Sequence, residues 1–102
     1  MSLSIEYEYS AEKNSKLMEE RGISFDQIIH CINSGRLLDT IEHHNQEKYA
    51  GQWFFVVDVD DYICLVPFVQ TENRVFLKTI FPSRKHTKSY LHEKLSKKEK
   101  DK

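Results

Sequence analysis

The sequence predicts an α+β domain in which two N-terminal helices and one C-terminal helix pack on an antiparallel sheet. Two early stretches combine helix-capping residues with apolar residues at helical spacing, and residues 36–81 change to an alternating apolar and polar pattern. Helix signals return after Pro82 and end near Leu95. The predicted element order is therefore β-α-α-β-β-β-β-α. A chain of 102 residues suffices for one hydrophobic core, so we assign one domain to residues 1–95 and a basic disordered tail to residues 96–102.

The chain before residue 36 contains signals for one strand and two helices. Apolar and polar residues alternate over residues 5–9, which predicts a short strand with one solvated face. Ser10 can cap a helix over Ala11–Arg21, and Gly22 ends it. Ser24 opens a second helix with a capping box. The apolar face of this second helix consists of Phe25, Ile28, Ile29 and Ile32.

Residues 36–81 predict four consecutive strands joined by polar turns. The alternation places these strands at Arg36–Glu42, Gln52–Val59, Tyr62–Val69 and Arg74–Phe81. Asp60 and Asp61 make the tight turn of a hairpin, and with Asp58 they are better explained as turn formers than as a magnesium site. Pro67 lacks the N–H group that a sheet ladder uses, so we expect an edge or a bulge there.

The composition excludes several classes of protein. With 39% hydrophobic and 30% charged residues, the chain fits neither a disordered protein nor a membrane protein. Its longest apolar run, Tyr62–Val69, is far shorter than the roughly 20 residues of a spanning helix. The N-terminal residues show no basic or apolar region of a secretory signal, so we expect a cytoplasmic protein. Cys31 and Cys64 lie in apolar stretches and are expected to be buried, reduced thiols.

The net charge of −1 conceals two oppositely charged parts of the chain. Residues 1–82 hold seven Lys and Arg against thirteen Asp and Glu, whereas residues 83–102 hold eight against three. Such an asymmetry is informative about partners rather than about the fold. The basic C-terminal part can bind phosphates or an acidic protein, and the acidic residues 1–82 can bind a basic protein.

The start of the last helix is the most informative part of the sequence. Ser83 suits the N-cap position. The first turn then holds Arg84, Lys85 and His86. A positive charge near a helix N-terminus costs about 0.3–1 kcal/mol, and no acid in this turn offsets it. Free N–H groups, the helix dipole and an arginine together form a phosphate site. The alternatives are that Arg84 pairs with an acid of the body, or that the helix begins at Thr87.

Lys78 precedes this helix in the last predicted strand. In a regular strand its side chain shares a face with those of Phe76 and Ile80. A lysine in such an apolar strand either extends from a solvated face into water or supplies a charge to a cleft. Because Lys78 is close to Arg84 along the chain, both interpretations stay open.

A polar loop after the first strand of this stretch contains His43 and His44. Imidazoles titrate near neutral pH and can act as general acid and base. Glu47 and Lys48 follow in the same loop, either as part of a site or as solvated charges. Neighbouring histidines point apart and a third firm ligand is absent, so we expect no metal. The chain has no glycine-rich phosphate loop, so we do not expect a nucleotide-binding fold. We also expect no cofactor.

Several short motifs follow one another over residues 5–91. They are Lys13-Asn14, Glu20-Arg21-Gly22-Ile23-Ser24-Phe25-Asp26, His43-His44 with Glu47-Lys48, and Leu77-Lys78-Thr79-Ile80 with Ser83-Arg84-Lys85-His86-Thr87. In this order they resemble the BrnT family, small RelE-like ribonuclease toxins of bacterial type II toxin–antitoxin systems. The resemblance implies a RelE-like fold and a cognate antitoxin with a ribbon-helix-helix DNA-binding part. Lysine stands at Lys48 and Lys78 where the family usually has arginine, and lysine cannot form a bidentate pair with phosphate.

The resemblance also implies metal-independent RNA cleavage, in which the ribose 2′-OH attacks the adjacent phosphate. Such a reaction needs a base, an acid and cations that stabilise the developing charge. The catalytic candidates are His43, His44, Glu47, Lys78 and Arg84. The RNA-binding candidates are Lys48, Lys85, His86 and Lys88. Lys78 and Arg84 are assigned to the phosphate, and the histidines or Glu47 to proton transfer. The expected partners are RNA and the antitoxin, and no membrane.

A second interpretation belongs to a different class of function. The basic last helix and the apolar sheet can hold a protein partner without turnover, for example along a strand edge. An adjacent gene for a small basic DNA-binding protein would favour the toxin, and a solitary gene would favour the binding module. Contact with RNA should weaken steeply with salt in either case, because phosphate neutralisation releases counterions.

Overall fold

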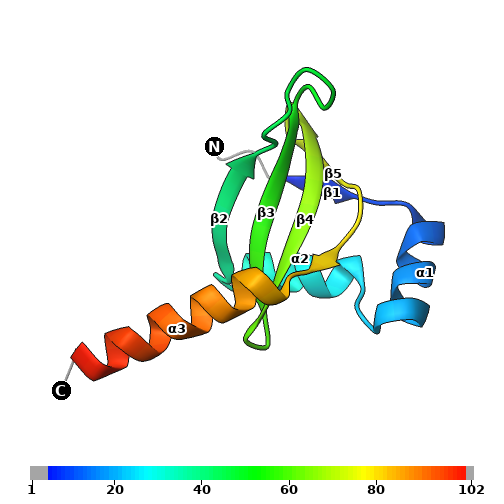
Figure 1. The fold of residues 1–102 in the computed structure, drawn as a ribbon. Helices are drawn as coiled ribbons and strands as arrows, with labels where there is room; N and C mark the ends of the chain where they lie inside the picture. The colour runs from blue at the N-terminus through cyan, green and yellow to red at the C-terminus, as the bar shows by residue number, and fades with distance from the viewer. Residues whose placement is uncertain (1–4, 101–102) are drawn as a thin grey trace.

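The computed structural model describes the backbone of residues 5–100 and the side chains of residues 5–92. Within these residues the chain has the predicted α+β class and element order, which confirms the expected fold class (Figure 1). The elements are β1 (Glu6–Glu8), α1 (Ala11–Arg21), α2 (Phe25–Asn33), β2 (Leu37–Glu42), β3 (Gln52–Val59), β4 (Tyr62–Thr71), β5 (Arg74–Leu77), β6 (Phe81–Pro82) and α3 (Arg84–Lys100). β6 is the short element that the sequence did not predict separately.

The six strands of the described chain form one sheet in the order β1-β5-β4-β3-β2, with β6 paired to β4. The pairs are antiparallel except that of β1 with β5, which is parallel. β3 and β4 form the central hairpin, which closes where Val59 pairs with Tyr62. Asp60 and Asp61 make its turn with φ angles of 52° and 67°, the left-handed conformation that tight two-residue hairpins require. The predicted tight turn is confirmed.

The core lies between the sheet and α2, which passes behind the strands in Figure 1. Its fully buried side chains include Phe25, Ile28, Val57, Val66 and Leu77. Cys31 and Cys64 are free thiols buried in the same core, as predicted. Burial raises the pKa of Cys64 to about 11. A thiol that stays protonated is a poor nucleophile, so Cys64 contributes packing rather than chemistry.

The chain leaves the sheet between β5 and β6, which corrects the prediction of one strand over Arg74–Phe81. The carbonyl of Pro67 in β4 accepts a hydrogen bond from the backbone N–H of Lys78 at 2.8 Å. Proline has no N–H to complete this pair, so the ladder cannot continue. β5 therefore ends at Leu77, residues 78–80 lie outside the strands, and β6 then pairs with β4 again. The irregularity expected at Pro67 is confirmed.

α3 crosses the other face of the sheet, in front of the lower ends of the strands in Figure 1. Ser83 is its N-cap, as predicted, because the Oγ of Ser83 accepts from the N–H of His86 at 3.2 Å. The first turn is fixed to β4 by the buried side chain of Thr87. Its Oγ1 accepts from the N–H of Ile63 at 2.8 Å and donates to the carbonyl of Ser83 at 2.6 Å. The alternative helix start at Thr87 is therefore wrong.

α3 continues to Lys100, beyond the end expected near Leu95. Residues 96–100, which were expected to belong to a disordered tail, therefore have a helical backbone. The side chains of residues 93–100 and all of residues 101–102 lie outside the described part. Among the described residues, no helix combines the length and the apolar character needed to cross a membrane.

Candidate functional site

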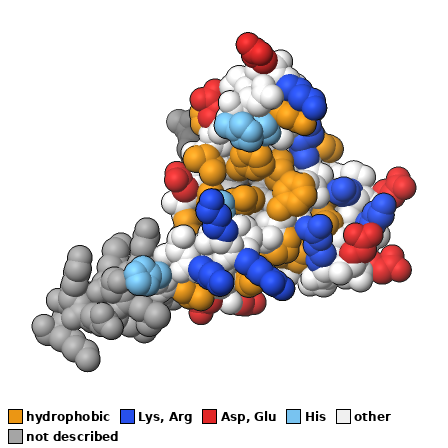
Figure 2. All heavy atoms as spheres, in the orientation of Figure 1, with side chains coloured by type: hydrophobic (Ala, Val, Ile, Leu, Met, Phe, Trp, Pro, Cys, Tyr) orange, Lys and Arg blue, Asp and Glu red, His pale blue; other side chains and the backbone are white. Residues whose placement is uncertain are grey.

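The sheet face opposite the core is only partly covered by α3. The uncovered part carries a patch of hydrophobic side chains, with histidines beside the β2–β3 loop and Lys and Arg side chains around it (Figure 2). A pocket of about 320 Å³ opens there, between the β2–β3 loop, β4 and the segment that joins β5 to β6. Its walls are His43, Tyr49, Gln52, Phe54, Pro67, Lys78, Thr79 and Phe81. We call it the His43–Lys78 pocket.

Lys78 directly follows the end of β5, and its backbone N–H pairs with the carbonyl of Pro67, which places its side chain beside this second residue of the pocket wall. The expected alignment of Lys78 with Ile80 on one strand face is wrong, since Ile80 is fully buried in the core and Lys78 is exposed. The Nζ of Lys78 lies 3.1 Å from Oε1 of Gln52, a largely buried residue of β3. No acid among the described residues forms an ion pair with Lys78, so its charge is available to an anion. This geometry favours the cleft interpretation of Lys78.

His43 forms another wall of the pocket, within a stack of rings. Its ring centroid lies 4.3 Å from that of Tyr49 and 5.3 Å from that of Phe54. The backbone N–H of Asn45 donates to Nδ1 of His43 at 3.0 Å, which leaves the proton of the neutral imidazole on Nε2. Burial lowers the pKa of His43, and the charge of neighbouring His44 lowers it further. At neutral pH, His43 is therefore a hydrogen-bond donor through Nε2.

The lowered pKa of His43 predicts a pH dependence of stability. Its pKa lies below the ordinary 6.5, so in moderately acidic solution the unfolded chain binds a proton that the folded protein does not bind. The free energy of unfolding should therefore decrease as the pH falls below about 6.5. His43→Phe keeps a ring in the stack and should show a weaker decrease. Urea denaturation of both proteins measures this difference, and an NMR titration midpoint for His43 at or above 6.5 would contradict it.

The other candidates of the β2–β3 loop lie outside the pocket. The side chains of His44, Glu47 and Lys48 are exposed and none of them lines its walls. His44 stacks on His43 with ring centroids 4.7 Å apart. The Nζ of Lys48 lies 5.4 Å from the ring centroid of Tyr49. His44 and Lys48 thus contact residues of the pocket wall without lining the pocket, and Glu47 has no such contact within the described residues.

The basic candidates of α3 form a second group, because none of them lines the His43–Lys78 pocket. Arg84, Lys85 and Lys88 are exposed, and within the described residues Arg84 forms no ion pair with an acid of the body. Lys and Arg side chains gather over the start of α3, on the face that also shows the loop histidines (Figure 2). His86 faces a groove between α3 and β2, with Nδ1 2.8 Å from Oγ of Ser83. His86 thus supports the helix cap.

Five further residues form or brace the pocket, and the sequence did not predict them as site residues. They are Arg21, Tyr49, Gln52, Phe54 and Phe81. Arg21 donates from Nη1 to the carbonyl of Ile80 at 2.8 Å, and its Cζ lies 5.9 Å from the ring centroid of Phe81. It thereby joins the end of α1 to the edge of the pocket. The alternation of β3 shows that Phe54 faces away from the core, but no local signal shows that this surface stays uncovered.

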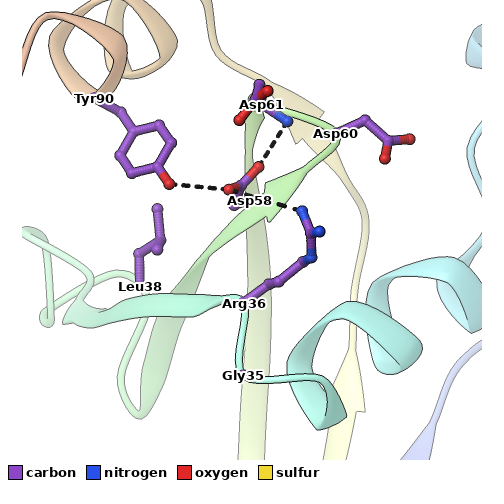
Figure 3. A pocket seen from close by; sticks show the side chains of 7 residues that line it. All are labelled: Gly35, Arg36, Leu38, Asp58, Asp60, Asp61 and Tyr90. Carbon is purple, nitrogen blue, oxygen red and sulfur yellow. Dashed lines mark hydrogen bonds and ion pairs between the residues drawn. The ribbon is translucent and has the colours of Figure 1, made fainter. Parts of the chain in front are cut away.

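A second pocket, of about 480 Å³, contains the three aspartates near the β3–β4 turn (Figure 3). Asp58 is buried and accepts hydrogen bonds from the backbone N–H of Asp61 at 2.8 Å and from the hydroxyl of Tyr90 at 3.0 Å. The carboxylate of Asp60 points away from Asp58 (Figure 3). Nη1 of Arg36 lies 3.9 Å from Asp58. The prediction that these aspartates form the turn is confirmed.

The motifs that resemble BrnT toxins occupy two regions of the molecule. The N-terminal motifs join α1 to α2, where Oδ1 of Asn14 accepts from the N–H of Phe25 at 2.8 Å. The loop and C-terminal motifs supply His43 and Lys78 to the pocket and the cations to the start of α3. Comparisons with protein-family models, with curated proteins and with solved structures find no match for this chain.

Proposed function

We propose that this protein is a metal-independent endoribonuclease of the toxin type that acts in the cytoplasm. The observation that carries the proposal is the placement of Lys78 and His43 in one open pocket, on the sheet face where α3 begins with cations. Two hydrogen-bond donors in a partly apolar cavity suit a phosphate, whose charge is stabilised more strongly there than in water. The resemblance to BrnT toxins supplies RNA as the substrate and a ribbon-helix-helix antitoxin as the partner.

In the proposed reaction, the ribose 2′-oxygen gives its proton to a base and attacks the neighbouring phosphorus. The bond to the 5′-oxygen breaks, and this oxygen takes a proton from solvent water, which yields a 2′,3′-cyclic phosphate and a 5′-hydroxyl end. Lys78 and the Nε2–H of His43 bind the non-bridging phosphate oxygens as their charge grows. Gln52 holds the lysine amine in place. His44 is the candidate base, because its ring is exposed whereas Nδ1 of His43 is occupied by the N–H of Asn45. DNA lacks the 2′-hydroxyl and should not be cleaved.

The cations at the start of α3 extend the proposed site along the substrate. Arg84, Lys85 and Lys88 are exposed and project from the first two turns of the helix. In our proposal they bind successive phosphates of the RNA backbone, which supplies affinity without sequence preference. Arg84 therefore has a binding role in this proposal, and its loss should weaken affinity and reduce the dependence of binding on salt.

Purified protein incubated with labelled single-stranded RNA in excess EDTA tests the proposal. We expect cleavage to products that end in a 2′,3′-cyclic phosphate, while DNA of the same sequence stays intact. A preparation of Lys78→Met made in the same way controls for contaminating nucleases. RNA that stays intact, or that is cut only after magnesium is added, would contradict the proposal.

A non-catalytic binding module remains the second candidate, because β2 is an exposed edge strand. Leu38 and Ile41 of this strand are 42% and 39% exposed, and they line the groove that also contains His86. An edge with free backbone groups and apolar neighbours can accept a strand from another protein. If this is the function, a protein partner should protect the β2 amides from hydrogen exchange, and no RNA should be cleaved.

A further inference from the structure

The walls of the His43–Lys78 pocket consist largely of rings, which RNA cleavage by itself does not require. Tyr49 and Phe81 are 37% and 46% exposed, although large aromatic side chains are mostly buried in folded proteins. Phe54 and His43 stack beside them. Lys78 contributes a positive charge to the same cavity. Exposed rings next to a cation are the features with which proteins hold unpaired bases.

We propose that the Phe81 side of this pocket holds one unpaired nucleobase stacked on the ring, beside the phosphate that Lys78 and His43 bind, so that the protein selects single-stranded RNA over duplex RNA. The choice of RNA as the ligand rests on the proposed function. A pocket of about 320 Å³ is at the small end of the roughly 300–1,000 Å³ that ligand pockets span, which suits a single planar base. Gln52 and Thr79 place polar groups in the same walls, where the edge of a base needs hydrogen-bond partners.

Phe81 is held in position by the protein itself. β6 pairs Phe81 with Leu65 of β4. The guanidinium of Arg21 lies over the ring and is tied to the carbonyl of Ile80. A ring that is already fixed loses little conformational entropy when a base stacks on it. A base in a duplex is paired and stacked on its neighbours, so its entry into the pocket first costs the energy of unpairing.

The test is equilibrium binding of an RNA analogue that cannot be cleaved, measured by fluorescence anisotropy. The probe is a labelled 2′-O-methyl uridine octamer, compared with an abasic octamer of the same charge and with a 2′-O-methyl duplex. We expect the intact protein to bind the uridine octamer about tenfold more tightly than the abasic octamer. Phe81→Ala should lose this preference, and Phe81→Trp should keep it.

Phe76→Ala is the matched control for loss of an exposed phenylalanine. Phe76 is 42% exposed on β5 but does not line the pocket, so this variant should retain the preference for uridine. The salt dependence of RNA binding distinguishes the contribution of the Phe81 ring from that of the Lys78 charge. Lys78→Met should reduce the slope of log affinity against log salt by about 0.7, whereas Phe81→Ala should leave the slope unchanged.

The binding result is independent of catalysis because the probe lacks a free 2′-hydroxyl. Equal affinity of the intact protein for the uridine and abasic octamers would overturn the base pocket, even if the protein cleaves RNA. A preference that persists in Phe81→Ala would overturn it as well. A protein that shows the Phe81-dependent preference but cleaves no RNA would retain the base pocket and would contradict only the nuclease proposal.

Discussion

Replacement of Lys78 by methionine is expected to lower the rate of RNA cleavage about 100- to 1,000-fold, the usual cost of one lost donor at a site of developing charge. Lys78 is the cation that lines the His43–Lys78 pocket, and its Nζ is directed by Gln52. Methionine keeps an unbranched apolar side chain at an exposed position, so the free energy of unfolding should change by less than about 0.5 kcal/mol. Initial rates on a fluorogenic RNA and urea denaturation measure the two quantities.

Lys48→Met is the matched control, because it removes an exposed lysine of the neighbouring loop that does not line the pocket. Its cleavage rate should stay within about threefold of that of the unchanged protein. Lys78→Arg keeps the charge and should retain more activity than the methionine variant. Equal rates for Lys78→Met and Lys48→Met would show that the pocket is not the site of phosphate binding.

The helices could be predicted from the sequence because their signals are local. Ser10, Ser24 and Ser83 each cap a helix by accepting from an N–H group three residues later, and the surrounding sequence contains all that this contact needs. The break after β5 is different in kind. It depends on the missing N–H of Pro67 in the neighbouring strand, so the segment itself shows an unbroken strand pattern. Predicting the break requires the register between two strands.

The candidate site could be predicted in part, for the same reason. The cations at the start of α3 conflict with the helix dipole, and this conflict is visible in the sequence. Which residues line the pocket depends on how much of the sheet α3 leaves uncovered. No local sequence pattern shows this area. The hydrogen bond from Asn45 to His43 also changed the role that we propose for His43, from proton acceptor to hydrogen-bond donor. A sequence motif does not show which imidazole nitrogen is occupied.

Replacement of Asp58 by alanine is expected to lower the free energy of unfolding by about 2–4 kcal/mol, since each buried hydrogen bond that loses its partner costs about 1–3 kcal/mol. Asp58 is 6% exposed and joins three parts of the molecule (Figure 3). It accepts from the N–H of Asp61 in the hairpin turn and from the hydroxyl of Tyr90 on α3. It also faces the guanidinium of Arg36 beside β2. Urea denaturation measures the loss.

Two variants show whether the buried acceptor is the cause. Asp58→Asn keeps one acceptor oxygen and the size of the side chain. Its free energy of unfolding should therefore decrease less than that of Asp58→Ala, by about 1–2 kcal/mol. Asp60→Asn alters the neighbouring turn residue, whose carboxylate points away from Asp58, and asparagine tolerates its left-handed φ of 52°, so stability should change by less than about 0.5 kcal/mol. Because Tyr90 lies on α3, amide exchange in the first turns of α3 should accelerate in Asp58→Ala. Equal stability of Asp58→Ala and Asp60→Asn would show that Asp58 does not hold α3 against the sheet.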